Sequence, residues 1–273
     1  MHYAVVVSTE PIDTAVAHPA RRYNYWLGGK DNFAADRASA DAIAAAWPSA
    51  PIAARENRRF LQRTVRYLAG EVGIRQFLDI GTGLPTADNT HEVAQSIAPQ
   101  TRVVYVDNDP MVMVHARALL TSAPEGRTAY LEADLRDPGR ILAHPELRST
   151  LDLSQPVGLM LVAVLHFIHG EGAGVPIVRE LLEALPSGSY LVASNATKDP
   201  SPPQVVELYD RMLASGQTDI WPRDRAEFSA LFDGLELVDP GVVLVNDWRS
   251  ENEPPPRPTG AEVAVYGAVG KLP

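Results

Sequence analysis

The stretch QFLDIGTGLPTADN, residues 76 to 89, runs from an apolar segment straight into a glycine-rich turn. A short apolar run that ends at Gly81 and Gly83 is typical of a buried strand leading into a ligand-binding turn. A dinucleotide-binding turn would carry a third small residue where this chain has Thr86, preceded by Pro85. The stretch therefore predicts a Rossmann-like start and argues against a nicotinamide cofactor.

The alternation of strand and helix continues beyond this turn. Strands are expected at 76–80, 102–107, 128–134, 157–165 and 189–196, and helices at 90–98, 110–120, 177–185, 202–214 and 223–234. This order favours a parallel sheet covered by helices on both faces, with right-handed crossovers. Segments 235–245 and 261–270 are expected to close it as an antiparallel edge hairpin, joined by a proline-rich loop.

The chain before residue 71 has a different pattern. Residues 1 to 20 read as extended, and helices are expected from Asp36 to Trp47 and from about Ile52 to Gly70. We therefore expect two parts: residues 1–70 as an N-terminal extension and helical cap, and residues 71–273 as the Rossmann-like domain.

Composition excludes several classes of function. The 273 residues include no cysteine, so disulfides and thiolate chemistry are excluded, and no apolar run is long enough to span a membrane. The formal net charge of -10 opposes binding to nucleic acid unless a basic patch is concentrated locally. With no signal peptide recognisable in the first residues, a cytoplasmic enzyme is expected.

Three successive strands of the predicted sheet end in a carboxylate: Asp79, Asp107 and Asp134. Because the carboxyl ends of parallel strands meet at one edge, these side chains should converge on one crevice. A carboxylate only accepts hydrogen bonds, so the ligand must offer donors or a positive charge, and a pyrophosphate offers neither. One such aspartate is equally well explained as turn chemistry, but three in order with the glycines favour a cofactor site.

At this point the chain resembles a bacterial family of S-adenosyl methyltransferases, found mainly in actinomycetes and long catalogued as a domain of unknown function. The motifs that carry the resemblance are HPARRYNYWLGGKDNFAADR, FLDIGTGLPT, VVYVDNDP, ADLRDP and LMLVAVLHFI, and they cover nearly the whole chain. The chain departs from the family pattern at Asn24, where an aspartate is expected, and at Asn195, where a histidine often stands.

The resemblance implies a class I methyltransferase fold: a doubly wound, mostly parallel sheet with an antiparallel C-terminal hairpin and an N-terminal helical cap. It implies S-adenosyl-L-methionine as cofactor and S-adenosyl-L-homocysteine as product. The residues expected to bind the cofactor are Asp79, Gly81, Thr82, Gly83, Asp107, Asn108, Asp134, Leu135, Ala163 and Arg58.

Each part of the cofactor has an expected partner. The glycines let the backbone approach the methionine portion of the cofactor. The carboxylate of that portion would be stabilised by the N-terminus of the following helix, which Thr86 or Asn89 would cap, or it would pair with Arg58. Asp107 suits the ribose hydroxyls and Asp134 the adenine amino group. Asp79 either attracts the ammonium group or hydrogen-bonds the turn, and these two readings are left open.

The catalytic residues are harder to assign. His166 follows the fourth strand and is the first candidate for a general base, although packing explains it as well. His169 could pair with it at a metal, but no third ligand is evident, so no metal is expected. Residues 21 to 33 are proposed as a lid that brings Tyr23 or Asp31 near the reacting atoms, with a simple aromatic anchor as the alternative.

The substrate is expected to be a small molecule. A DNA adenine methyltransferase is disfavoured because VLHF stands where an Asn-Pro-Pro-Tyr signature would. A cofactor sensor without catalysis is the main alternative, and a nicotinamide dehydrogenase a weaker one. Neither the acceptor nor the oligomeric state can be read from the sequence.

Overall fold

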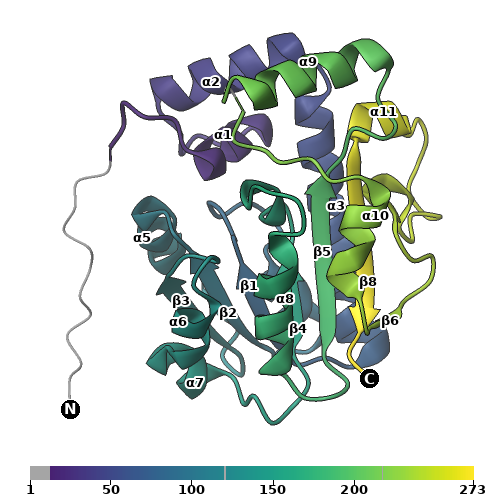
Figure 1. The fold of residues 1–273 in the computed structure, drawn as a ribbon. Helices are drawn as coiled ribbons and strands as arrows, with labels where there is room; N and C mark the ends of the chain where they lie inside the picture. The colour runs from purple at the N-terminus through teal and green to yellow at the C-terminus, as the bar shows by residue number, and fades with distance from the viewer. Residues whose placement is uncertain (1–12, 120, 217) are drawn as a thin grey trace.

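The computed structural model describes residues 13–119, 121–216 and 218–273 and shows an eight-stranded sheet in the order β3-β2-β1-β4-β5-β8-β6, with β7 paired to β8. The strands are β1 (Gln76–Ile80), β2 (Arg102–Asp107), β3 (Arg127–Glu132), β4 (Gly158–Leu161), β5 (Tyr190–Ala196), β6 (Glu236–Leu237), β7 (Val243–Leu244) and β8 (Val265–Lys271). Strands β1 to β5 are parallel to one another, as predicted, and the order reverses between β1 and β4 (Figure 1). In such a sheet the ligand crevice lies beyond the carboxyl ends of these two strands.

The helices follow the predicted alternation and add several short ones. They are α1 (Pro19–Trp26), α2 (Ala34–Ala46), α3 (Ala50–Arg66), α4 (Thr90–Ile97), α5 (Pro110–Leu119), α6 (Pro138–Ala143), α7 (Pro145–Thr150), α8 (Gly174–Glu183), α9 (Pro203–Ala214), α10 (Arg225–Ser229) and α11 (Gly260–Val263). Single turns of other helix types are η1 (Tyr67–Val72), η2 (Leu165–Phe167), η3 (Ala230–Phe232) and η4 (Val245–Asp247). The predicted extended segment 1–20 falls largely outside the described residues, and its end already belongs to α1.

The C-terminal strands differ from the expected edge hairpin. Their antiparallel pairing is confirmed, but β8 lies between β5 and β6, so the last strand is internal to the sheet. The predicted strand 235–245 is divided into the two-residue strands β6 and β7 by a turn at Asp239–Gly241. The predicted strand 261–270 begins as the short helix α11, and only its second half enters the sheet.

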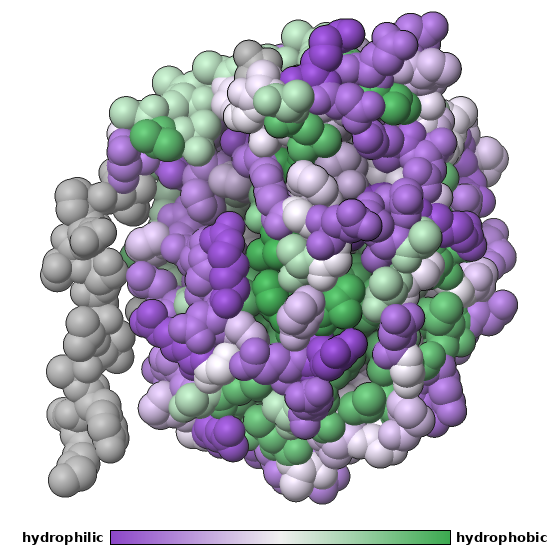
Figure 2. All heavy atoms as spheres, in the orientation of Figure 1, coloured by the Kyte–Doolittle hydropathy of each residue, from purple (hydrophilic) through white to green (hydrophobic). Residues whose placement is uncertain are grey.

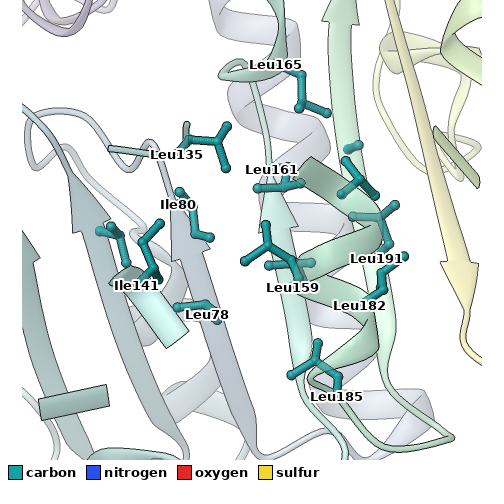
Figure 3. Packing of buried hydrophobic residues seen from close by; sticks show 14 of the residues in the cluster. Leu78, Ile80, Leu135, Ile141, Leu159, Leu161, Leu165, Leu182, Leu185 and Leu191 are labelled. Carbon is teal, nitrogen blue, oxygen red and sulfur yellow. The ribbon is translucent and has the colours of Figure 1, made fainter. Parts of the chain in front are cut away.

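Alternate residues of each strand point to opposite sides of the sheet, and a hydrophobic core covers each side. Leu78 and Ile80 of β1 belong to a core with α6, α7, α8 and η3, in which leucines predominate (Figure 3). Phe77 belongs to a second core, which includes residues of α3, α4 and α5. Helix α3 therefore packs on the sheet itself, with Phe60 fully buried against it.

Helices α1, α2 and α9 lie beyond the carboxyl ends of the parallel strands, above the crevice that the strand order defines (Figure 1). Helix α9 has no fully buried residue, although its sequence is amphipathic. Within the described residues, none of the helices has both the length and the apolar character needed to cross a membrane.

Candidate active site

The turn after β1 requires glycine at one position for a steric reason. Gly81 has a φ of +76°, and a Cβ atom added there would lie 2.4 Å from Cγ2 of Val164. Its N–H donates to the carbonyl of Val106 at 2.8 Å, as does that of Thr82 at 3.2 Å, which fixes the turn to β2. Gly83 also has a positive φ, of +68°, but a Cβ there would meet only open space. The backbone at Gly83 is thus accessible to a ligand.

Asp107, at the end of β2, holds this turn from the other side. Its Oδ2 accepts from the N–H of Gly83 at 2.8 Å, and its Oδ1 accepts from the N–H of Asp109 at 3.0 Å. Burial raises the pKa of the Asp107 carboxyl, and the two backbone hydrogen bonds act in the opposite direction. Since each carboxylate oxygen has two lone pairs, Asp107 can still accept from ligand hydroxyls.

Asp79, at the end of β1, is buried and connects that strand to α4. Its Oδ2 accepts a hydrogen bond from the Thr90 hydroxyl at 2.6 Å, and not from the glycine turn. Burial raises the pKa of Asp79 to about 6, although the Thr90 hydrogen bond and the nearby charge of Arg58 lower it. A carboxylate in this position is unfavourable unless a positive group approaches it.

Arg58 reaches the same region from α3. Its Nη2 donates to the carbonyl of Ala87 at 3.1 Å and to Oδ1 of Asn89 at 3.0 Å, next to the start of α4. Asn89 occupies the N-cap position, as predicted, and its N–H donates to Glu92 at 2.7 Å. Arg58 Nε and the Thr86 hydroxyl are both buried and have no hydrogen-bond partner among the described residues. Two buried donors without a partner in the described chain suit a ligand carboxylate.

Asn108, Asp134 and Leu135 come together at the end of β3. Asn108 Nδ2 donates to Asp134 Oδ2 at 3.1 Å, and Leu135 is buried in the core beside them. Arg136 was not anticipated from the sequence: its N–H and Nη1 donate to Asp134 at 2.8 and 2.9 Å, and its Nη2 reaches the carbonyl of Phe167 at 3.4 Å. In an Asx turn the side chain of an aspartate accepts from the backbone N–H two residues later, so the contact of the Arg136 N–H with Asp134 could have been predicted from the sequence.

A chain of hydrogen bonds joins the exit of β4 to the cap. The N–H of Ala163, which has a φ of +57°, donates to Ser194 Oγ at 2.9 Å, and Ser194 Oγ donates to Asn57 Oδ1 at 2.6 Å. Asn57 Nδ2 donates to the Tyr23 hydroxyl at 3.1 Å, which in turn donates to the Ala54 carbonyl at 2.8 Å. Burial raises the pKa of Tyr23, so its hydroxyl stays protonated. Ser194 was not identified from the sequence because its partners are distant along the chain.

Asn24 organises the loop that follows α1. Its Oδ1 accepts from the N–H of Asp31 at 3.1 Å and from Asn32 Nδ2 at 3.0 Å. The Asp31 carboxylate lies 3.7 Å from Nδ1 of His115, so the structure places it beside α5. The loop thus packs toward the β2 side of the crevice.

A second connection between cap and sheet runs through Arg21. Asp36, fully buried, accepts from the N–H groups of His18 and Phe33, both at 2.8 Å. Arg21 Nε lies 3.7 Å from Asp36 and 3.6 Å from Asp109, directly after the end of β2. The guanidinium is therefore shared between the cap and the loop that carries Asp107.

His166 lies in η2, directly after the β4 exit. Burial lowers its pKa to about 4, so the imidazole is neutral near pH 7, and its Nδ1 is buried with no partner among the described residues. His169 Nε2 instead contacts the carbonyl of Asp219 at 2.8 Å, so the two histidines do not form a pair. In the part of the chain that the structure describes, no group of three potential ligands could hold a metal ion.

A separate groove lies against α8, on the face of the sheet that this helix covers (Figure 1). It is lined by α8, the segment around η3 and the last residues of the chain, including Val178, Leu182, Leu231 and Leu272. Figure 2 shows apolar residues gathered across the middle of this face, over α8 and the segments beside it. None of the residues predicted for the site lines the groove.

The sheet order, the glycine turn and the three strand-end carboxylates define a class I S-adenosylmethionine-dependent methyltransferase fold. A family described as S-adenosyl methyltransferase matches residues 6–273, so the chain belongs to that family. The fold and the resemblance stated from the sequence are thereby confirmed, as is the prediction of a methyltransferase that uses S-adenosylmethionine.

Two solved structures are similar over almost the full length. A DUF574 family protein from Streptomyces avermitilis MA-4680 is 50% identical, with a TM-score of 0.91, 96% of this chain covered and 100% of that one. A candidate methyltransferase from Thermobifida fusca YX is 42% identical, with a TM-score of 0.85, 96% of this chain covered and 97% of that one. Among curated proteins, no sequence matches the chain.

Proposed function

We propose that this methyltransferase binds S-adenosylmethionine across the turn at Gly81–Gly83 and methylates a small-molecule acceptor beyond the end of β4. The observation that carries the proposal is the hydrogen bond from the Gly83 N–H to Asp107, because it places a carboxylate at the open side of a turn that no side chain fills.

The residues around the turn fit the cofactor part by part. Asp79 would face the ammonium group, while Arg58 Nε and the Thr86 hydroxyl, both buried without partners in the described chain, would serve the carboxylate. Asp107 would accept from the ribose hydroxyls. Bound there, the cofactor supplies a methyl group on a sulfonium that is already activated.

The adenine end is proposed to lie by Asn108 and Asp134, with Leu135 beneath it. Because Arg136 already donates twice to Asp134, a ligand amino group would use the remaining lone pairs of that carboxylate. Thr82 would contribute by holding the turn in place, since its backbone N–H donates to the Val106 carbonyl.

The chain's own groups are proposed to orient the acceptor and exclude water, which is most of what methyl transfer requires. Ala163 and His166 would line the acceptor position after β4. Tyr23 would act by holding α1 in position, because its hydroxyl already accepts from Asn57 and donates to the Ala54 carbonyl. A catalytic role for Asp31 stays a prediction.

The helices beyond the strand ends support a small acceptor. Helices α1, α2 and α9 lie over the crevice (Figure 1), which leaves less room for a macromolecule than an open edge would. We propose that α1 and α2 form the cap of the predicted N-terminal part, with α3 serving as the wall on which the cap rests.

The test is titration calorimetry of the full chain with S-adenosylmethionine, S-adenosylhomocysteine and NAD, followed by a mass-spectrometric screen for methylated small molecules. The expected result is binding of the first two and not of NAD, with at least one acceptor methylated. Binding of NAD alone would overturn the cofactor assignment. Cofactor binding without any transfer to small molecules or macromolecules would instead indicate a sensor.

A further inference from the structure

The region beyond η2 forms a second cluster, apart from the cofactor residues. It is built by α1, α9, η2 and residues 218–223. Arg22 pairs with Asp219, and His169 contacts the Asp219 carbonyl. The backbone N–H of Trp221 donates to the His166 carbonyl at 2.7 Å. Tyr209 of α9 is close enough to Asp219 that this charge adds to the effect of burial, which raises the pKa of Tyr209 to about 12. The cluster follows Ala163 directly, on the side where an acceptor would enter.

Nitrogen atoms in this cluster are buried without partners. Trp221 Nε1 and His166 Nδ1 have no hydrogen-bond partner among the described residues, and neither has Trp26 Nε1. Trp26 lies one helical turn after Arg22, so it shares the face of α1 that meets Asp219. An indole N–H can only donate, and a buried donor without a partner is unfavourable. A ligand that fills the cluster should therefore present hydrogen-bond acceptors.

The walls of the cluster are aromatic. The rings of His166 and Phe167 lie 4.4 Å apart and nearly perpendicular, and those of His169 and Trp221 lie 6.0 Å apart. Flat aromatic surfaces of this kind favour a planar ligand that stacks or meets a ring edge.

The charges of the cluster disfavour a cationic ligand. Asp219, which belongs to the cluster, is already paired with Arg22, which is itself buried. Arg223, 1% exposed, donates to the carbonyls of Leu165, the first residue of η2, and of Ile168, the residue after η2. An ammonium group would therefore approach two guanidinium groups with no free carboxylate among the described residues of the cluster.

The side chain considered as a base beside the β4 exit is that of His166, in η2. His166 is neutral with a lowered pKa, so it would accept a proton from a hydroxyl only with difficulty. A neutral amine on an aromatic ring needs no such step, since its nitrogen lone pair is available before any proton is lost.

Resting on the proposed function, we propose that the acceptor is an uncharged aromatic molecule that offers a hydrogen-bond acceptor to the Trp221 indole and is methylated on a neutral nitrogen. The nitrogen lone pair forms the new N–C bond, the electron pair of the broken C–S bond stays on sulfur, and the proton of the resulting N-methylammonium passes to water.

The test uses three matched probes with the full chain near neutral pH: para-aminobenzamide, para-hydroxybenzamide and para-(aminomethyl)benzamide. Each has the same ring and amide, and they differ in presenting a neutral amine, a hydroxyl or an ammonium group. Binding is measured by ligand-observed NMR with and without S-adenosylhomocysteine, and N-methylation by mass spectrometry with S-adenosylmethionine. The variant is Trp221→Phe, which keeps the ring and removes the N–H.

The control is Trp248→Phe, because the Trp248 indole N–H is likewise buried without a partner in the described chain but packs against Phe60 and Tyr67 on α3 and η1. The para-amino probe should bind and be methylated, the ammonium probe should bind least, and Trp221→Phe should weaken binding of the amide probes by about tenfold, as for one lost hydrogen bond. Trp248→Phe should leave binding unchanged.

Three outcomes overturn the inference: no probe binds at its solubility limit, the hydroxyl or ammonium probe is preferred, or Trp221→Phe binds like the wild type. If S-adenosylhomocysteine still binds in calorimetry, the proposed function survives that failure. If S-adenosylhomocysteine does not bind, the proposed function fails, while probe binding without cofactor still decides the inference.

Discussion

Ser194 Oγ donates a hydrogen bond to Asn57 Oδ1 at 2.6 Å and thereby joins the centre of the sheet to α3. The same hydroxyl accepts from the N–H of Ala163, whose left-handed backbone opens the turn after β4. One buried hydroxyl thus holds both the wall under the cap and the turn beside the proposed transfer position.

Replacing Ser194 with alanine should leave two buried groups unpaired, the Ala163 N–H and Asn57 Oδ1. We expect a loss of about 2 to 4 kcal/mol in the free energy of unfolding, and a roughly fivefold loss of S-adenosylhomocysteine affinity as the turn relaxes. The control is Ser189→Ala, since Ser189 at the other end of β5 accepts from the Val157 N–H at 3.1 Å. Ser189→Ala should lower the stability without lowering the affinity for S-adenosylhomocysteine. If Ser194→Ala binds S-adenosylhomocysteine as tightly as Ser189→Ala does, Ser194 has no role in the site.

Tyr23→Phe should remove the link between α1 and α3. The Asn57 amide loses its acceptor there, so we expect a loss of about 1 to 2 kcal/mol by chemical denaturation. Tyr25→Phe is the matched change, because the Tyr25 hydroxyl lies on the surface near Asp41, at 3.2 Å, and its removal should cost about 0.5 kcal/mol or less. Equal effects of the two changes would show that the anchor is not Tyr23.

The two turn glycines should fail in different ways when changed to alanine. Gly81→Ala combines a left-handed backbone with a clash against Val164, so a loss of about 3 kcal/mol or more in folding stability is expected. Gly83→Ala carries only the backbone cost of about 1 to 2 kcal/mol, but its methyl group would enter the space proposed for the cofactor. Thermal unfolding and calorimetry separate these effects, and undiminished cofactor binding by Gly83→Ala would exclude that placement.

Asp79→Asn should stabilise the cofactor-free protein above neutral pH. The folded pKa of about 6 lies above the unfolded value, so the folded state binds the proton more tightly, and stability is lost as pH rises from about 4 to 6. Asparagine has no charge to lose and can still accept from Thr90, so its advantage should be near zero at pH 4 and reach about 3 kcal/mol above pH 7. Denaturant unfolding of both proteins from pH 4 to pH 8 measures this difference in the free energy of unfolding. A difference that does not change with pH would show that the pKa of Asp79 is not raised.

Asp107→Ala should weaken S-adenosylhomocysteine at least tenfold, because it removes a charged acceptor worth roughly 1.5 to 3 kcal/mol per hydrogen bond and frees the Gly83 N–H. Glu132→Ala tests whether charge alone matters, since Glu132 is the register partner of Asp107 on β3 and is exposed. Calorimetry should find the Glu132 variant unchanged. A comparable loss in both would point to the overall field of this edge, not to a specific contact.

Much of the fold could be predicted because apolar runs such as 157–165, alternating with helical segments, are typical of buried parallel strands. Helices α6 and α7 were missed because each is short and begins at a proline, Pro138 and Pro145, so neither shows a helical period. The position of β8 was wrong for another reason: local pattern predicts antiparallel pairing but not which strand becomes the partner.

The arrangement of the candidate site residues could be predicted only in part. The strand-end aspartates follow from the order of strands and turns, which is a local signal. The contacts of Ser194, of Arg22 with Asp219 and of Arg21 with Asp109 join segments that only the folded chain brings together, and no spacing in the sequence marks them.

The internal position of β8 also matters during synthesis. Strand β5 pairs with β8 over its whole length, from Tyr190 with Lys271 to Ala196 with Val265. Until β8 has been synthesised, one edge of β5 would stay open in the nascent chain, and open edges invite pairing with other chains. Because α9, α10, β6 and β7 lie between β5 and β8 in the chain, that edge stays open while all of these segments are synthesised, and during this interval the growing sheet is exposed to aggregation.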